Sequence, residues 1–209
     1  FRSVVVWDGT LPPEKTHIES KLRELDAEGL VCMVSDEIDA DVLDASPDLA
    51  VVSAFSVGYD HIDVEAAAER DIAVGHTPGV LTETTADLAW TLLMAAARRT
   101  VEAHEYVAAD EWEAWDPTLL MGADVHDATL GIVGLGSIGF ATARRAAGFG
   151  MDVLYTGRNP KPEREDELAE IGVDATYVEL DALLADSDFV SLHVPLLDET
   201  EGLIGEAEL

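Results

Sequence analysis

The chain has 209 residues, of which 48% are hydrophobic and 26% are charged, enough apolar material for one or two packed cores. This composition excludes a disordered tail, and a single cysteine excludes a small disulfide-stapled domain. Forty-three acidic residues against 12 basic ones give a net charge of −31 at pH 7. Phosphodiester backbones and anionic lipid headgroups repel such a surface, so neither nucleic acid nor a membrane is expected as a partner.

The compartment is predicted from the apolar runs and from Cys32. The longest apolar runs fall well short of the roughly 20 residues that a membrane span needs, and no signal peptide is visible. Cys32 lies between Val31 and Met33, which favours a buried, inert thiol in a reducing compartment. A cytoplasmic location is therefore expected. The acidic residues are spread along the whole length, a pattern typical of salt-adapted, halophilic proteins.

The first part of the chain alternates short β-branched runs with amphipathic stretches. In chain order, the pattern predicts a strand over 4–7, a helix over 14–28 closed by Gly29, strands over 30–34 and 49–55, a helix over 64–70 and a strand over 72–75. Strands that are regularly separated by helices predict a mostly parallel sheet covered by helices.

The middle of the chain is predicted as one long helix over 82–106. Its apolar surface is wider than one sheet face needs, so we expect this helix to pack against both halves of the chain or against a second subunit. Residues 110–127 have poor periodicity, two tryptophans and a proline, which is typical of an extended excursion. The boundary between two domains is therefore expected within 98–128.

The alternation of strands and helices begins again after this excursion. The pattern predicts strands over 129–133, 152–155, 175–178 and 188–194, and helices over 138–149, 163–171 and 180–185. A second parallel sheet covered by helices follows from this order.

A glycine motif lies where the first strand of this second sheet meets its helix. It reads Gly134-Leu135-Gly136-Ser137-Ile138-Gly139, and this strand-to-helix context is the one that a dinucleotide fold requires. Gly134 would permit the tight turn, Gly136 would let the backbone approach a pyrophosphate, and Gly139 would allow the helix to pack closely on the strand. The alternative is a glycine-rich turn without a ligand.

The second strand of this unit ends without the acid that would bind the ribose 2′-hydroxyl of NAD. It is followed by the sequence Gly157-Arg158-Asn159-Pro160-Lys161. Arg158 can bind a 2′-phosphate through two hydrogen bonds, and Lys161 can add a point charge. We therefore predict NADPH as the cofactor in preference to NADH. The alternative is that Arg158 is a surface base paired with Glu163 or Glu165, which contributes little to stability.

Several further motifs accompany the glycine turn. They are Ser56-Val57-Gly58-Tyr59-Asp60-His61-Ile62-Asp63, Thr77-Pro78-Gly79-Val80-Leu81-Thr82, Thr85-Ala86-Asp87-Leu88-Ala89, Ala97-Arg98-Arg99 and Leu154-Tyr155-Thr156-Gly157-Arg158. With the glycine motif, they resemble the D-isomer-specific 2-hydroxyacid dehydrogenases, and most closely the glyoxylate/hydroxypyruvate reductases of that family. The resemblance implies an α/β fold with two lobes: a flavodoxin-like substrate-binding lobe over 1–98, then an NAD(P)-binding Rossmann lobe over 99–209 that is incomplete at its C-terminus.

The resemblance also implies the residues of the site. The amides of Val57 and Gly58 would bind the substrate carboxylate. The cofactor would be bound by Gly134, Leu135, Gly136, Ser137, Ile138, Gly139, Gly157, Arg158, Asn159, Pro160, Lys161, Val194 and Pro195. In similar reductases, the segment that holds Trp112 and Trp115 lies at the dimer interface and reaches toward the neighbouring active site; ordinary packing is the alternative for both side chains. A homodimer through residues 82–128 is expected.

The implied activity is NADPH-preferring reduction of a small 2-oxoacid, glyoxylate or hydroxypyruvate, to the D-2-hydroxyacid. In the family, the catalytic Arg, Glu and His follow the point that corresponds to Leu209, so we assign no catalytic residue here and expect a longer protein. A catalytically silent nucleotide sensor or scaffold on the same fold is the alternative, and a dinucleotide enzyme acting on amino acids is a third possibility. The sequence shows no zinc-ligand spacing, and no metal is expected.

Three positions depart from the family pattern or invite a different interpretation. His76 stands where many relatives have Asn, and Asp87 where many have Glu; we interpret both as structural. His61 lies beside Asp60 and Asp63, and this group is interpreted as a loop-capping cluster rather than a metal site.

Overall fold

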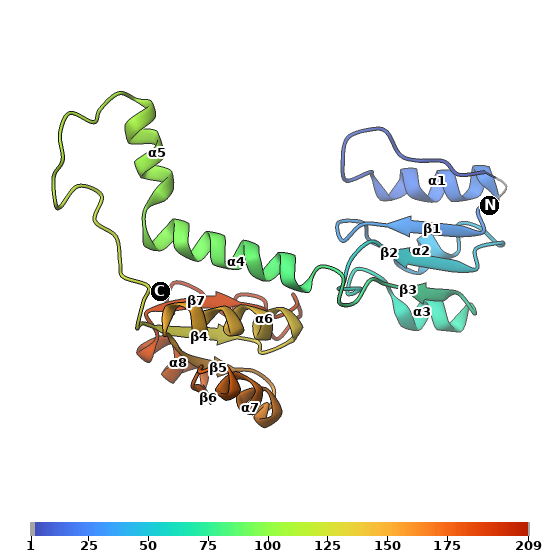
Figure 1. The fold of residues 1–209 in the computed structure, drawn as a ribbon. Helices are drawn as coiled ribbons and strands as arrows, with labels where there is room; N and C mark the ends of the chain where they lie inside the picture. Colours follow the sequence, from blue (N-terminus) through green and yellow to red (C-terminus); the bar gives the residue numbers. More distant parts are fainter. Residues whose placement is uncertain (1–2, 209) are drawn as a thin grey trace. The chain divides into compact units, whose positions relative to one another are not determined.

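The computed structural model describes residues 3–208, which divide into two compact units (Figure 1). Unit 1 extends to Val80 and includes Pro195–Asp198; unit 2 comprises Leu81–Val194 and the residues from Glu199 onward. The division therefore lies earlier than the one expected after residue 98. The two units divide earlier because the long helix that follows Val80 packs against a helix of unit 2.

Unit 1 is built on a three-stranded sheet in the order β1-β2-β3, and all its strand pairs are parallel. Its elements are α1 (Lys15–Leu25), β1 (Gly29–Cys32), α2 (Ala40–Leu43), β2 (Val51–Ala54), α3 (Val64–Glu69) and β3 (Ala73–Gly75). Its core contains Val52 of the central strand and Val42 of α2, both fully buried. The predicted parallel sheet covered by helices is confirmed for this unit.

Two of the expectations for unit 1 are wrong. Residues 4–7 form no strand, and the side chains of Val4, Val5 and Val6 are exposed. In the described chain, β1 is an edge strand that pairs only with β2. Residues 4–7 therefore have no partner strand, and without one their backbone groups form no ladder of hydrogen bonds. The first helix also ends earlier than predicted, because Asp26 takes the left-handed conformation that terminates α1, and Gly29 begins β1 instead.

Unit 2 contains a four-stranded parallel sheet in the order β6-β5-β4-β7. Its elements are α4 (Thr82–Ala97), α5 (Thr100–Ala108), β4 (Thr129–Val133), α6 (Ser137–Arg145), the 3₁₀ helix η1 (Ala146–Phe149), β5 (Asp152–Thr156), α7 (Pro162–Glu170), β6 (Ala175–Tyr177), α8 (Leu180–Asp186) and β7 (Phe189–Leu192). This order, in which the chain moves outward from β4 to β6 and then returns to the other side of β4, is that of a Rossmann sheet.

The long helix predicted over 82–106 is two helices in the structure. Arg99 has φ 50°, a left-handed conformation that a helix interior does not accept, and α5 starts directly after it. The helix predicted over 138–149 likewise ends at Arg145 and continues as the tighter helix η1. Residues 110–127 form no helix or strand, as expected.

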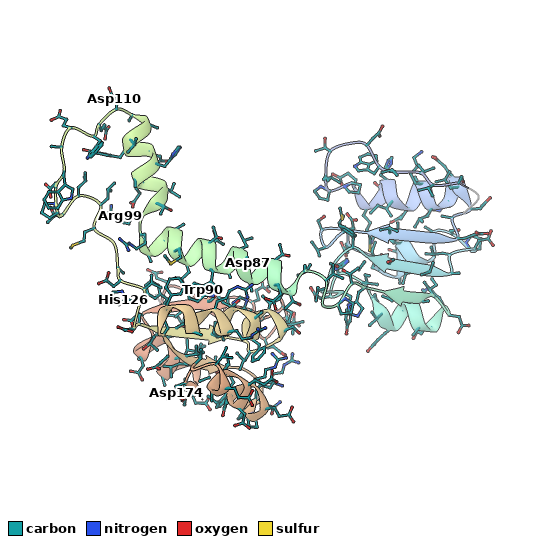
Figure 2. The ribbon with its side chains drawn as sticks, in the orientation of Figure 1. Asp87, Trp90, Arg99, Asp110, His126 and Asp174 are labelled. Carbon is teal, nitrogen blue, oxygen red and sulfur yellow. The ribbon has the colours of Figure 1, made fainter. Side chains whose placement is uncertain are left out.

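Trp90 joins α4 to the core of unit 2. Its ring stacks on that of Phe149 with a centroid separation of 4.8 Å, and its Nε1 donates a hydrogen bond to the carbonyl of Thr142 at 2.8 Å. Figure 2 labels Trp90 on the side of α4 that faces the sheet. Among residues 3–208, no helix combines the length and apolar character required to cross a membrane.

Candidate functional site

The carboxyl ends of three strands in unit 2 bring most of the predicted cofactor residues to one edge of the sheet. The amide of Gly134, just after β4, donates to the carbonyl of Thr156 at the end of β5, at 2.9 Å. The amide of His193, just after β7, donates to the carbonyl of Val133 at 2.8 Å. The glycine turn, Val194 and the loop that begins at Gly157 therefore lie together. They are at the carboxyl edge of the sheet, which is where ligands bind in open parallel sheets.

Two of the three motif glycines are required by the backbone. Gly134 has φ +96°, and a Cβ built on it would lie 2.6 Å from the carbonyl oxygen of His193 and 2.8 Å from Cγ1 of Val194. A Cβ on Gly139 would lie 2.1 Å from the carbonyl oxygen of Gly134. Any side chain at either position would push the turn away from α6 or β7.

Gly136 is different, because apart from Gly136 and its two chain neighbours no atom lies within 4 Å of the position its Cβ would occupy. Gly136 is the residue before α6, and no side chain caps this helix end within the described part of the chain. The amides of Ser137 and Ile138 are therefore at a helix N-terminus beside open space, an arrangement that attracts an anionic group. The side chain of Leu135, in contrast, is buried beneath the turn.

A buried tyrosine supports the loop that follows β5. The Tyr155 hydroxyl donates a hydrogen bond to the carboxylate of Glu165 and accepts one from the amide of Lys161 at 2.6 Å. Burial and this carboxylate raise the pKa of Tyr155 to about 12, so the phenol stays neutral. At the other end of the loop, the Tyr177 hydroxyl donates to the carbonyl of Gly157 at 3.1 Å. Both ends of the loop are thus fixed by tyrosines.

The predicted 2′-phosphate residues lie on the exposed part of this loop. Arg158, Asn159, Pro160 and Lys161 are all exposed, and the Arg158 side chain is 74% accessible. Arg158 forms an ion pair, but with Glu199 rather than with Glu163 or Glu165 as the alternative interpretation had it.

Arg164 is a residue of this region that the sequence analysis missed. Its Nη1 donates to the carbonyl oxygen of Leu135 at 2.5 Å, and its guanidinium lies 5.2 Å from the centroid of the Phe140 ring. Arg164 therefore links α7 to the tip of the glycine turn. The sequence held one signal for it: Arg164 is the third basic residue within seven positions, in a chain with only 12 bases.

In unit 1, the predicted substrate loop has its carbonyl groups engaged and its amide groups free. Thr77 donates to the carbonyl of Ser56 at 2.9 Å, His76 Nδ1 donates to that of Val57 at 2.9 Å, and Ser56 Oγ donates to that of Gly58 at 2.6 Å. Within residues 3–208, the amides of Val57 and Gly58 have no acceptor. Two neighbouring donors without a partner are suited to bind a carboxylate. His76 has a structural contact, as interpreted.

Cys32 and His61 also lie at this end of unit 1. The Cys32 sulfur is 3.8 Å from His61 Nε2, and burial, together with the charge of Asp36, raises the pKa of Cys32 to about 11. The thiol is therefore protonated and inert near neutral pH. Asp63 caps α3 by accepting from the amide of Ala66 at 2.8 Å. The described residues hold no cluster of three His, Cys, Asp or Glu side chains that could bind a metal ion.

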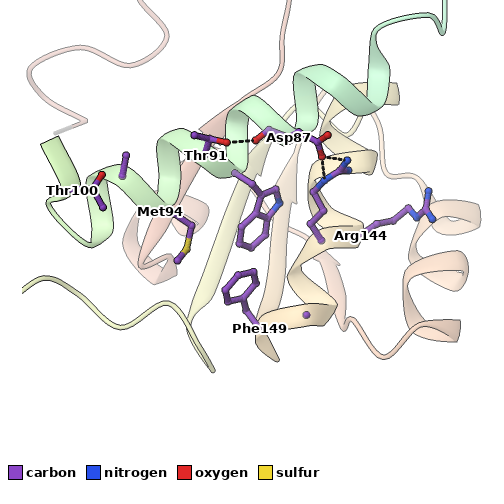
Figure 3. A pocket seen from close by; sticks show the side chains of 10 residues that line it. Asp87, Thr91, Met94, Thr100, Arg144 and Phe149 are labelled. Carbon is purple, nitrogen blue, oxygen red and sulfur yellow. Dashed lines mark hydrogen bonds and ion pairs between the residues drawn. The ribbon is translucent and has the colours of Figure 1, made fainter. Parts of the chain in front are cut away.

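A pocket of about 860 Å³ lies away from the glycine turn, between α4, the end of α6 and η1 (Figure 3). Its lining includes Thr91, Met94 and Phe149. At its rim, Arg145 donates to Asp87 through Nε at 3.0 Å, which joins α6 to α4. This ion pair gives Asp87 the structural role interpreted from the sequence. Trp112 and Trp115 are 60% and 80% exposed, which excludes core packing within the described chain.

The sheet order, the three glycine environments and the open start of α6 define unit 2 as a dinucleotide-binding α/β fold. Residues 90–209 match the family described as "D-isomer specific 2-hydroxyacid dehydrogenase, NAD binding domain". The chain belongs to the D-isomer specific 2-hydroxyacid dehydrogenase family.

Proteins of this family from several organisms are similar to the chain. A glyoxylate reductase from Korarchaeum cryptofilum is 53% identical over 98% of this chain and 60% of its own length. The TT0316 protein from Thermus thermophilus is 47% identical, with a TM-score of 0.81 over 93% of this chain and 58% of its own. A D-lactate dehydrogenase from Aquifex aeolicus, solved with NAD and lactic acid, is 29% identical, with a TM-score of 0.77 over 91% of this chain and 54% of its own. The chain thus spans about 60% of the length of the curated relatives it matches.

Proposed function

We propose that this chain is part of an NADPH-preferring oxidoreductase that reduces a small 2-oxoacid, glyoxylate or hydroxypyruvate, to the D-2-hydroxyacid. The observation that carries the proposal is the glycine turn, which has open space over Gly136 and lies beside a β5 end where Arg158 replaces the acid typical of NAD sites. The glyoxylate reductases among the relatives support the substrate class.

The proposed cofactor site uses residues from all three strand ends. The amides of Ser137 and Ile138 would face the pyrophosphate, and the bases of the 157–161 loop would surround the 2′-phosphate. Val194 and Pro195 would border the nicotinamide side. When bound, the cofactor supplies the hydride, while the protein supplies orientation and electrostatics.

The proposed substrate site is the pair of free amides at Val57 and Gly58. They would hold the carboxylate of the oxoacid, and His76 and Thr77 would keep both amides in place through the carbonyl bonds described above. The catalytic Arg, Glu and His of the family are not assigned to any of residues 1–209.

The first test measures the dissociation constants of NADPH and NADH by nicotinamide fluorescence before and after Arg158→Ala. We expect the wild-type protein to prefer NADPH. Removing a charge-assisted bond to phosphate should weaken NADPH binding roughly 10- to 100-fold and leave NADH within about twofold. Arg99→Ala is the matched control, because Arg99 pairs with Glu102 on α5. An unchanged NADPH/NADH ratio in Arg158→Ala would refute the assignment.

Turnover separates the reductase from its alternative. In the longer protein of which this chain is proposed to be part, addition of glyoxylate or hydroxypyruvate to the NADPH complex should oxidise the nicotinamide, which is followed by its absorbance. Tight NADPH binding without oxidation by either acid would favour the silent sensor or scaffold instead.

We also propose a homodimer that forms through α4, α5 and the segment 110–127. Leu92 of α4, Val101 of α5 and both tryptophans of the segment are exposed apolar side chains, and Leu92 and Val101 line a common pocket. A second copy that covers them would remove this surface from water. Sedimentation should give a dimer, and Leu92→Glu should shift it toward the monomer.

A further inference from the structure

The ion pair between Arg158 and Glu199 joins two segments of unit 2 that lie 41 positions apart. Arg158 comes from the loop after β5, and Glu199 comes from the segment after β7. Both side chains are largely exposed, at 74% and 63%. Glu163 and Glu165 are much nearer to Arg158 in the sequence, but neither forms an ion pair with it in the described structure. Glu165 instead accepts the hydrogen bond from the Tyr155 hydroxyl.

The carboxylate of Glu199 uses the same guanidinium that the proposed function assigns to the 2′-phosphate of NADPH. A phosphate monoester carries a charge of about −1.5 to −2 near neutral pH, so it has the same sign as the carboxylate. If Glu199 stays in place it repels the incoming phosphate, and if it leaves, its ion pair must first be broken. In both cases the binding free energy of NADPH becomes less favourable. NADH has a neutral 2′-hydroxyl and meets no such opposition.

We propose that Glu199 is a specificity-determining residue that competes with the 2′-phosphate for Arg158 and so narrows the preference for NADPH over NADH. This inference rests on the proposed function. The size of the effect follows from exposure: an exposed ion pair shifts an equilibrium by up to about fivefold at low salt. Added salt screens both the pair and the repulsion, so the effect should shrink as ionic strength rises.

The test compares Glu199→Gln with Glu201→Gln, two variants that remove the same charge two positions apart. Glu201 is exposed and forms no ion pair within the described residues. Dissociation constants for NADPH, NADH and adenosine 2′-monophosphate are measured by fluorescence or calorimetry at low salt. We expect Glu199→Gln to tighten NADPH and adenosine 2′-monophosphate about two- to fivefold, with NADH unchanged. Glu201→Gln should change all three by less than about 1.5-fold.

A double-mutant cycle distinguishes the two proposals. In an Arg158→Ala background, Glu199→Gln should no longer change NADPH affinity, because Arg158 is the residue that holds the exposed Glu199 carboxylate at this position and an unpaired carboxylate can turn into solvent. If Arg158→Ala weakens NADPH selectively but Glu199→Gln does not tighten it, or if Glu201→Gln tightens it equally, the competition is refuted and the proposed cofactor stands. If Arg158→Ala leaves NADPH affinity unchanged, the cofactor assignment itself fails.

Discussion

At the scale of single residues, His76 holds a carbonyl of the loop that is proposed to bind the substrate. A carbonyl oxygen only accepts, so His76 Nδ1 is the donor in its 2.9 Å contact with Val57. The ring also packs edge-on against Tyr59, with a centroid separation of 5.1 Å. These contacts fix the peptide that carries one of the two free amides.

We predict that His76→Ala raises the KM for the oxoacid about fivefold with little change in kcat, because one neutral hydrogen bond contributes about 1 kcal/mol. Steady-state kinetics with glyoxylate, on the longer protein of which this chain is proposed to be part, checks this. His76→Asn, which keeps a donor, should recover most of the loss, and His126→Ala is the exposed control. A fall in kcat alone would contradict a role in holding the substrate loop.

His193 follows β7, and its carbonyl oxygen is the atom nearest to the position that a Cβ on Gly134 would occupy. Burial lowers the pKa of His193, and its Nε2 lies 2.9 Å from Ser191 Oγ. The unfolded chain, with a histidine pKa of about 6.5, therefore binds a proton more readily than the folded one. The contribution of neutral His193 to the free energy of unfolding is fully present above pH 6.5. It is lost as the pH falls through the lowered pKa that His193 has in the folded protein.

We predict that the urea midpoint falls as the pH is lowered from 7 to 5, and that His193→Gln flattens this slope. Urea unfolding at several pH values measures it, with exposed His104→Gln as the control. The carboxylates with lowered pKa values, such as Asp44 beside Arg70, lose their contribution only at lower pH. An unchanged slope in His193→Gln would show that other groups cause the dependence.

At the scale of elements, α4 is attached to unit 2 by the buried indole of Trp90 and by ion pairs from α6 to Glu83 and Asp87. Trp90 is the largest side chain that α4 places in the core of unit 2, and Leu93 and Met94 of the same helix pack against that core. Arg145 adds contacts to Asp87 and Glu83. The sequence predicted the helix but could not assign it to a unit, because an apolar helix surface does not specify its neighbour.

We predict that Trp90→Phe lowers the free energy of unfolding by about 1–3 kcal/mol, because it removes the bond to Thr142 and part of the stacked ring. Urea unfolding followed by circular dichroism gives the value. Ile171→Val, at a 46% exposed position after α7, should change it by less than about 0.5 kcal/mol. Equal effects would mean that α4 does not depend on this contact.

At the scale of the whole molecule, the main electrostatic feature is the net charge of −31 at pH 7. The basic side chains that form ion pairs do so on the surface, which neutralises only a small part of the 43 acids. The screening length falls from about 10 Å at 0.1 M salt to about 3 Å at 1 M, so salt relieves the repulsion among the remaining acids. This is the physical basis for proposing a halophilic protein.

We predict that the melting temperature rises by at least about 5 °C between 0.1 and 2 M KCl. Thermal unfolding followed by circular dichroism measures it. Sucrose at matched osmolality is the control, because it is excluded from the surface without screening charge. A flat or falling curve in KCl would refute salt adaptation.

The sequence by itself determined the parallel sheets, the glycine turn and the basic loop after β5. These features follow from short-range rules: β-branched runs favour strands, the glycine spacing of a strand-to-helix turn is read directly from the sequence, and so is the missing acid after the second strand. Gly134, Gly139 and Arg158 could therefore be named before any coordinates. The strand expected over 4–7 failed because a strand also needs a partner, which a local pattern does not contain.

Only the tertiary structure decided which distant groups meet. Arg164 reaches the Leu135 carbonyl, Tyr155 holds the Lys161 amide, and Glu199 takes Arg158, although nothing in the local sequence selects these partners. The break at Arg99 and the attachment of α4 to unit 2 were decided in the same way. Such contacts depend on where each strand and helix ends in space, which is set by the packing of the whole unit rather than by any one segment.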